Sequence, residues 1–490
     1  MMGRQESPQE KLFSYHVNLS DRVRRDHPLR KVVKFINFDF IYDEVKGSYG
    51  QNGNVSVPPP VILKMMFLLF FYDVRSEREL METIPERLDW LWFLGYDLDD
   101  EIPDHSVLSK ARARWGVDGF KMFFERIVMQ CIDAGLVEGS KLFIDASLID
   151  ANASNNSVVD QHSLKRYLNK SYLRLEESLE DTDAKKTPVN SRHISTTDPD
   201  ASVSRYSSGK PKLRYKTHRC VDQKSEIITV TKITTGSVDD GKMFTEMVEK
   251  HEDMVKADIV VAVGDSKYGT TENYLFCYDR KIKGHMASLE KTQEGTGRRK
   301  GIFSKGAFGY DPHSDTYTCP AGQKLRRRHY YKKKNQYEYR ADKGACAQCP
   351  LRDNCTRAKD GRSLKRHLRQ DELDYLRMEA SSTRAMRDIK KRQDLSERSF
   401  AWSTRYGYKR ARWRRLWRME IQDFLIAAVQ NISILIRQKP LKKADVRSEN
   451  RPMKASADRI NALYCRIFSF LHNYSDSRRF SAANYPKMLT

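Results

Sequence analysis

The 490-residue chain lacks an apolar run long enough to span a membrane. Its most apolar segment, VILKMMFLLFFY (61–72), has twelve residues and contains Lys64, whereas a membrane-spanning helix needs about 20. The opening segment MMGRQESPQEKLF has no apolar core of the kind a secretory signal requires. We therefore expect a cytoplasmic protein with no membrane partner.

Cysteine is also scarce, with eight residues in the whole chain. That number is too small for a disulfide framework, and the thiols of a cytoplasmic protein stay reduced. Four of the eight nevertheless fall between positions 319 and 355. A local role for those four is considered below.

Acidic residues are outnumbered: 65 Asp and Glu stand against 88 Lys and Arg, so the formal net charge is +23 and the pI is near 9.5. This excess favours a polyanionic partner, most commonly nucleic acid, although a generally basic protein has the same composition. A hydrophobic content of 39% is enough for a core despite a mean hydropathy of -0.70. The length predicts two or three compact units.

Local patterns divide the chain into helical and mixed regions. Apolar residues recur at helical spacing before position 135, and strand-like runs begin at KLFIDASLI (141–149). The predicted units are an N-terminal tail (1–27), a helical DNA-binding or assembly domain (28–138), the first part of a catalytic core (139–284, with a polar insertion at 151–212), a basic Cys-containing insertion (285–369), the C-terminal helices of the core (370–438) and a C-terminal tail (439–490).

The region after position 139 predicts a mixed α/β sheet. LRYKTHRCVD (213–222) and SEIITVTKITTG (225–236) read as a hairpin, an amphipathic helix follows, and DIVVAVG contains a short apolar strand at 259–263 before another helix. The order strand, strand, strand, helix, strand, helix is typical of a mixed sheet flanked by helices. A short helix is also expected at 161–180.

Three carboxylates stand where such a sheet usually builds a site. Asp145 interrupts an apolar strand, Asp265 follows another, and Glu397 lies in a later helix that we expect to cross the sheet. Taken singly, each acid could be a structural residue that caps a loop or lies on the surface. Together they would repel one another unless a cation neutralised them, and carboxylate oxygens suit Mg²⁺ or Mn²⁺. Two such ions roughly 4 Å apart assist phosphodiester cleavage.

The chain resembles bacterial insertion-sequence transposases of the DDE type. The matching stretches are PVILKMMFLLFFYDVRSERELMETI, DHSVLSKARARW, FIDASLIDANAS, STTDPDA, YKTHRCVD, TTGSVDD, VVAVGDSKYGTTENY and ERSFAWSTRYGYKR. The resemblance implies a ribonuclease H-like core, with Asp145, Asp265 and Glu397 as catalytic metal ligands for two Mg²⁺ or Mn²⁺ ions. It also implies a nucleoid-associated bacterial protein that forms a homodimer on double-stranded DNA, namely the terminal inverted repeats and the target.

The chain departs from the family around the glutamate. The family often has Tyr and Arg shortly before this residue and Lys seven positions after it, where this sequence has Lys390, Gln393 and Thr404. Glu420 is the alternative third acid. Asp239 occupies a position that the family often fills with Asp, and we interpret it as a supporting or structural residue.

Basic residues near these motifs are candidates for contact with the DNA backbone. Those of RRRHYYKKK (326–334) flank aromatic residues in a basic-aromatic strip that suits contact with a nucleic-acid backbone. Solvated basic helices are the structural alternative. The candidates are Lys110, Arg112, Arg114, Arg326, Arg327, Arg328, Arg405, Lys409, Arg410, Arg412, Arg414 and Arg415.

The four clustered cysteines, Cys319, Cys346, Cys349 and Cys355, include one C-x2-C pair. Thiolates at this spacing suit a structural Zn²⁺, but one Cys stands where a zinc ribbon usually has two. We weigh zinc equally against a reduced cluster without metal.

The predicted function is transposition, in which phosphodiester hydrolysis at the element ends is followed by attack of the freed 3′-OH on target DNA. Two alternatives stay open: a catalytically inactive, transposase-derived DNA-binding protein, and a metal-dependent endonuclease that does not join strands.

Overall fold

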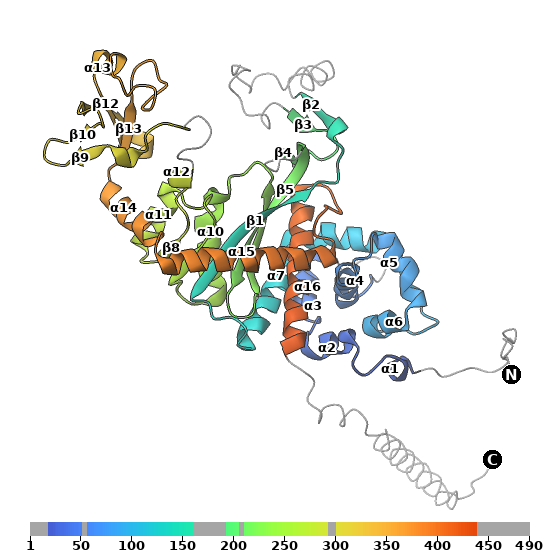
Figure 1. Cartoon of the computed structure of the whole chain (residues 1–490). Helices are drawn as coiled ribbons and strands as arrows, with labels where there is room; N and C mark the ends of the chain where they lie inside the picture. The colour runs from blue at the N-terminus through green and yellow to red at the C-terminus, as the bar shows by residue number, and fades with distance from the viewer. Residues whose placement is uncertain (1–17, 51–55, 161–192, 205–209, 293–299, 439–490) are drawn as a thin grey trace, which may run out of the picture.

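The computed structural model describes residues 18–50, 56–160, 193–204, 210–292 and 300–438. It consists of a helical N-terminal region, a central mixed sheet covered by helices, and a small β-rich insertion at the opposite end from the N-terminal helices (Figure 1). The mixed α/β class with a helical N-terminal region, predicted above, is confirmed. The predicted helix at 161–180 and the tail at 439–490 lie outside the described residues.

The N-terminal helices form around an aromatic core. Helix α4 begins at consecutive prolines, which fit the first turn because their missing N–H groups need no partner there. Ser76 caps the start of helix α5, where its hydroxyl accepts the Glu79 N–H. The helices are α1 (Leu19–Arg22), α2 (Pro28–Phe35), α3 (Ile41–Val45), α4 (Pro59–Phe71), α5 (Glu77–Thr83), α6 (Leu88–Leu94) and α7 (Ser106–Asp133).

This helical region starts before position 28, where we expected it to start, since Leu19 and Val23 are already buried. Helix α7 is broken at Gly116, whose φ of 64° lies in the left-handed region that glycine adopts without strain. The chain leaves α7 at Gly135, which also has a positive φ.

The central sheet has the order β6-β5-β1-β7-β8, with β4 beside the start of β5. Strand β5 is antiparallel to β1 and β6, and β7 and β8 are parallel to β1. The predicted hairpin is present as β5 and β6. The strands are β1 (Lys141–Asp150), β4 (Ser202–Ser204), β5 (Lys212–Asp222), β6 (Ile228–Thr235), β7 (Val261–Val263) and β8 (Lys283–His285).

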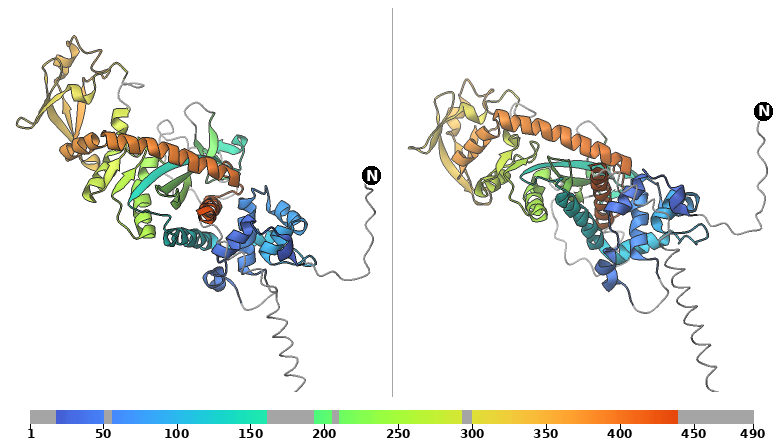
Figure 2. Two further views of the ribbon diagram at one scale, coloured as in Figure 1. Left: turned by 60° about the horizontal axis from the view of Figure 1, so that its bottom comes forward. Right: turned by 90° about the horizontal axis from the view of Figure 1, so that it is seen from below.

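Helices cover both faces of this sheet. On one face, α10 (Phe244–Val255) and α11 (Thr271–Asp279) pack on Leu142, Ile144 and Cys220. On the other, α15 (Thr383–Ser403) lies along the sheet (Figure 2). Helix α16 (Leu416–Gln438) lies between this face and α7 and joins the sheet to the core of the N-terminal helices.

Helix α16 is long and apolar enough to cross a membrane by length and composition, but 94% of its apolar window is buried inside the protein. Its buried polar residues have partners within the fold: Asp423 accepts from Arg219 and Thr217, and Asn431 pairs with the backbone of Ile228. These features are typical of a core helix.

The predicted polar insertion contains short strands and a buried acid. Strands β2 (Val158–Asp160) and β3 (His193–Ser195) pair with each other. Asp198 is fully buried and accepts hydrogen bonds from Tyr215 Oη and Arg415 N, while Asp200 accepts from Leu416 N at the start of α16. The motif STTDPDA therefore fixes the start of the core helix.

The Cys-bearing insertion forms a five-stranded antiparallel sheet with the order β13-β12-β11-β10-β9 and a small core of its own around Leu325 and Tyr339. Helices α12 (Leu289–Thr292) and α14 (Gln370–Glu379) flank it in the sequence. Its elements are β9 (Gly309–Asp311), β10 (Thr316–Thr318), β11 (Lys324–Tyr331), β12 (Gln336–Arg340), α13 (Lys343–Ala347) and β13 (Ser363–His367).

Candidate active site

Strand β1 directs Asp145 toward helix α15. Alternate side chains of a strand point to the same face. Lys141 bonds Asp388 of α15 at 2.5 Å, Phe143 packs with Leu395, and the Asp145 carboxylate (Oδ2) accepts from Arg392 Nη1 at 2.6 Å. The intervening residues of β1 face the other layer of helices. The acid in the core strand thus lies on the α15 side of the sheet.

Asp265 lies near Asp145, two residues past the end of the neighbouring strand β7. Phe143 pairs with Val263 in the parallel ladder between β1 and β7, and each Asp follows its member of that pair by two residues. Asp265 Oδ1 accepts the backbone N–H of Lys267 at 2.9 Å, which fixes the turn after β7. The parallel pairing of β1 with β7, together with the end of β7 after Val263, therefore brings these two acids together.

The environment of Asp145 disfavours its charge. Burial raises the pKa of Asp145, with nearby Asp265 adding to the rise, while Arg392 and the Ala146 N–H oppose it. The Asp145 side chain is 20% exposed. Two neighbouring carboxylates with restricted solvent access are a donor set that a divalent cation would stabilise.

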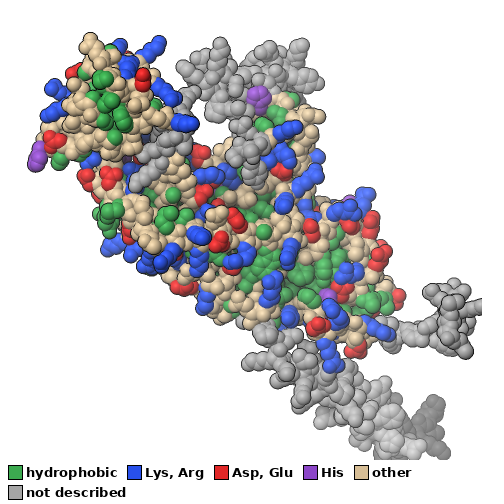
Figure 3. All heavy atoms as spheres, viewed as in Figure 1, with side chains coloured by type: hydrophobic (Ala, Val, Ile, Leu, Met, Phe, Trp, Pro, Cys, Tyr) green, Lys and Arg blue, Asp and Glu red, His purple; other side chains and the backbone are tan. Residues whose placement is uncertain are grey.

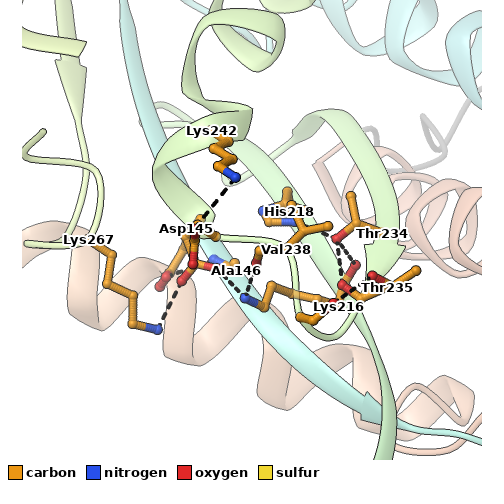
Figure 4. Close-up of polar contacts among 12 residues, drawn as sticks. Asp145, Ala146, Lys216, His218, Thr234, Thr235, Val238, Lys242 and Lys267 are labelled. Carbon is orange, nitrogen blue, oxygen red and sulfur yellow. Dashed lines mark hydrogen bonds and ion pairs between the residues drawn. The ribbon is translucent and has the colours of Figure 1, made fainter. Parts of the chain in front are cut away.

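A third acid at this edge of the sheet is Asp240. We expected Asp239 in this role, but the Asp239 side chain is 80% exposed, whereas Asp240 is buried and pairs with Lys216 at 2.6 Å and Lys267 at 2.9 Å. Figure 4 shows Lys216, Lys242 and Lys267 in the same view as Asp145; Lys216 and Lys267 pair with Asp240, and Lys242 pairs with Asp239. Asp145 and Asp265 also contribute to the raised pKa of Lys267, after the direct bond to Asp240. One ammonium therefore lies within the field of all three acids.

Within the described residues, no hydrogen bond or ion pair links Glu397 to this pair of aspartates. Helix α15 turns Asp388, Arg392 and Ser396 toward the sheet, and Glu397 follows on the exposed side, where it accepts from Gln393 Nε2 at 3.0 Å. The alternative acid, Glu420, lies on α16 and bonds Lys232 at 2.9 Å. Among the residues that the structure describes, no three His, Cys, Asp or Glu side chains are already arranged as metal ligands.

Two of the basic candidates are buried and serve the fold. Arg112 is 4% exposed, pairs with Glu77 and stacks on Trp413 at 3.9 Å. The Arg412 side chain is 11% exposed and bonds Asp73 and the Val74 carbonyl. These two predictions of DNA contact are wrong. The direction of a side chain changes from residue to residue along a helix or turn, so some residues of a basic segment point inward, and there Glu77 pairs with Arg112 and Asp73 pairs with Arg412.

The remaining candidates have exposed side chains. Arg114 stacks on Tyr49 at 4.5 Å. Asp150 N and O bond Lys409 O and Ala411 N, so the basic segment runs beside the end of β1. The exposed candidates are Lys110, Arg114, Arg326, Arg327, Arg328, Arg405, Lys409, Arg410, Arg414 and Arg415.

The four cysteines lie near one another in the insertion. Cys319, Cys346 and Cys355 border the same small core, and Cys319, Cys346 and Cys349 add to the burial that raises the pKa of Cys355. Cys319 Sγ accepts the N–H of Gln323 at 3.3 Å, and all four thiols are free. The thiols are neighbours, although they are not arranged as a ligand set in the part of the chain described here.

Two protein-family models match the chain. One, described as "Transposase domain (DUF772)", matches residues 17–114, and the other, described as "Transposase DDE domain", matches residues 318–436. No curated protein matches. Among solved structures, the piggyBac transposase synaptic complex with hairpin DNA aligns over 87% of this chain and 82% of that chain, at 9% identity and a TM-score of 0.25.

Proposed function

We propose that this chain, which a transposase-domain model matches at residues 17–114 and a transposase DDE-domain model at residues 318–436, is a DDE-type transposase that transposes an insertion sequence. In this proposal it hydrolyses the phosphodiester at the element ends and then transfers the freed 3′-OH to target DNA. The observation that carries the proposal is the placement of Asp145 and Asp265 near each other, each two residues beyond the pair Phe143 and Val263 of the parallel strands β1 and β7.

The sheet supports a ribonuclease H-like core. Strands β1, β5 and β6 lie side by side and antiparallel, and β7 and β8 add on the other side of β1, parallel to it. This order leaves β1 central, and the end of β7 lies beside the first half of β1, just before Asp145. A site for phosphoryl transfer in such a core needs its first two acids at these two neighbouring positions.

The donor set fits a divalent cation. Asp145 and Asp265 would hold Mg²⁺ or Mn²⁺, and two such ions would supply the positive charge that activates the attacking hydroxyl and stabilises the leaving oxygen. Lys267 adds a cation of the protein itself beside the two acids. It is well placed to bind a non-bridging oxygen of the phosphodiester.

Glu397 is the third carboxylate of the proposal. It lies within the matched Transposase DDE domain, on the helix that crosses the face of the sheet bearing Asp145. Glu420 already has Lys232 as its partner. Replacing each glutamate with Gln separates the two candidates: Glu397→Gln would abolish cleavage and Glu420→Gln would leave it largely intact.

Double-stranded DNA is the proposed substrate, and the exposed cations beside strand β1 would hold its backbone. Lys409 and Arg410 lie at the end of the strand that carries Asp145. We propose that the helical region takes part in recognising the terminal repeats and in forming a homodimer on DNA, and that the protein works in the cytoplasm, on the nucleoid.

The test is a cleavage and joining assay with labelled element-end DNA and Mg²⁺, comparing the parent with Asp145→Asn and Asp265→Asn. Loss of cleavage with DNA binding retained supports the proposal. Unchanged cleavage in both variants would refute the two-aspartate site. Cleavage without joined product identifies an endonuclease, and DNA binding without either product identifies an inactive, transposase-derived binder.

A further inference from the structure

Arg392 donates a hydrogen bond from helix α15 to the acid pair, and Ser396 of the same helix also interacts with Asp145. Arg392 Nη1 donates to Asp145 Oδ2 at 2.6 Å, and only 11% of the Arg392 side chain is exposed. Its Nε is buried without a hydrogen-bond partner. A guanidinium rarely gives up hydration for a single bond, because each unpaired buried donor costs free energy.

The bond occupies an oxygen that the proposed metal needs. Asp145 has two carboxylate oxygens: Oδ1 accepts the Ala146 N–H at 2.8 Å, and Oδ2 accepts from Arg392. A divalent cation between Asp145 and Asp265 would approach from the α15 face, where the guanidinium lies. The two cations therefore compete for the same carboxylate.

The rest of the helix would stay in place if this bond broke. Asp388, one turn before Arg392, is held by Lys141 at 2.5 Å and by His285 at 2.7 Å, and Leu395 packs on the core beside Phe143. A long arginine side chain can thus change partner without movement of its backbone. The new partner must be an anion, since the charge of arginine persists at all working pH values.

We propose that Arg392 is a positioning residue that couples metal entry to DNA binding. Its guanidinium holds Asp145 until DNA arrives, and then moves to a phosphate of the bound strand while the metal takes the carboxylate. The inference rests on the proposed function, since that function supplies both the metal and the DNA. By linkage, DNA tightens metal binding and metal tightens DNA binding, each by the same factor.

The experiment measures Mn²⁺ binding to the full-length protein by calorimetry, with and without a short duplex of arbitrary sequence. The proteins are the parent, Arg392→Gln, and Arg387→Gln as a matched control. Arg387 lies on the exposed side of the same helix, so its loss changes the charge by the same amount without touching Asp145.

We expect Arg392→Gln to bind Mn²⁺ without DNA roughly tenfold to a hundredfold more tightly than the parent, the range that corresponds to one charge-assisted hydrogen bond. We also expect DNA to raise the Mn²⁺ affinity of the parent and of Arg387→Gln, but not that of Arg392→Gln. Equal or weaker Mn²⁺ binding by Arg392→Gln, or an equal gain in Arg387→Gln, would overturn the inference.

Two further measurements keep the outcomes distinct. If Arg392→Gln does not fold, the coupling is tested on the parent alone by comparing its Mn²⁺ affinity with and without DNA. An affinity that DNA does not change contradicts the coupling. If Asp145→Asn binds Mn²⁺ as well as the parent, the proposed metal site itself is wrong. Mn²⁺ binding that requires Asp145 but does not respond to Arg392→Gln leaves the proposed function standing and rejects the coupling.

Discussion

Asp145 and Asp265 each stand two residues beyond a paired residue of the parallel ladder between β1 and β7, so the two carboxylates share one edge of the sheet. Two neighbouring carboxylates repel each other and destabilise the fold unless a cation lies between them. The same arrangement that suits phosphoryl transfer is therefore a cost to stability.

Replacing Asp265 with Asn should stabilise the protein in EDTA by about 1 kcal/mol, since it removes one of two repelling charges. Asn keeps the acceptor for the Lys267 N–H. Asp145→Asn should instead destabilise the protein, because Arg392 loses its partner. Thermal melts of the three proteins in EDTA and in Mg²⁺ test this, and a lower melting temperature for Asp265→Asn in EDTA would contradict it.

The buried pair of Arg112 and Glu77 predicts a second stability effect. Glu77→Gln leaves the guanidinium charge unpaired inside the helical region and should cost about 3 kcal/mol of unfolding free energy. The control is Lys110→Gln, because Lys110 lies two residues before Arg112 on the exposed side of α7. This substitution should change stability little. Urea denaturation measures both, and equal midpoints would show that the pair contributes nothing.

The pH dependence of stability should include a contribution from His218. Burial lowers the pKa of His218 to about 4, and its ring bonds Thr234 Oγ1 at 3.0 Å. The unfolded chain takes up a proton near pH 6.5 and the folded chain only near pH 4, so stability falls as the pH drops through this window. The loss approaches about 3 kcal/mol at its lower end.

His218→Asn removes this titration, so its unfolding free energy should fall less between pH 7 and pH 4.5 than that of the parent. His313→Asn, which replaces an exposed histidine of the insertion, is the control. Denaturation curves across this pH range give the slopes. Parallel slopes for the parent and His218→Asn would rule out His218 as the source.

The acid pair could be predicted because Asp145 interrupts one apolar strand and Asp265 follows another, and such hydrophobic patterns fix which residues face the core. The side of a helix to which a given side chain points was harder to predict. Glu397 and the buried Ser396 are neighbours in sequence but point to different sides of α15. Arg112 and Lys110 likewise separate into a buried and an exposed residue of α7.

Contacts between distant segments left no signal in the sequence. Arg392 bonds Asp145 only because α15 crosses the sheet beside that residue. Arg412 is buried only because Asp73 of the N-terminal helical region pairs with it. The choice between Asp239 and Asp240 depends on which of two adjacent carboxylates meets Lys216. Each outcome is set by tertiary packing, and not by residue type or spacing.

Zinc in the insertion is a direct prediction from the four neighbouring cysteines. Protein purified without added zinc should carry about one equivalent, since four thiolates complete a tetrahedral site. Cys349→Ser should lower both the zinc content and the melting temperature, while Cys277→Ser, at a buried thiol on α11, should leave the zinc content unchanged. Less than about half an equivalent in the parent would rule out the structural site.

The insertion should bind the DNA backbone through its exposed cations. Residues 301–369 contain 17 Lys and Arg against six Asp and Glu, and Figure 3 shows Lys and Arg side chains around the rim of this region. Lys332, Lys333 and Lys334 follow strand β11 and are all exposed. Replacing the three with Glu should weaken binding of duplex DNA of any sequence and reduce the slope of log affinity against log salt by roughly 2 to 3.

The matched control reverses three exposed lysines of the catalytic core, Lys256, Lys281 and Lys283, which changes the net charge by the same amount. A general effect of net charge would weaken both triple variants equally. A contact made by the insertion weakens only the first and lowers only its salt slope, because counterion release counts the phosphates that are neutralised. Equal slopes for the two variants in a salt titration would therefore remove the insertion from the DNA-binding surface.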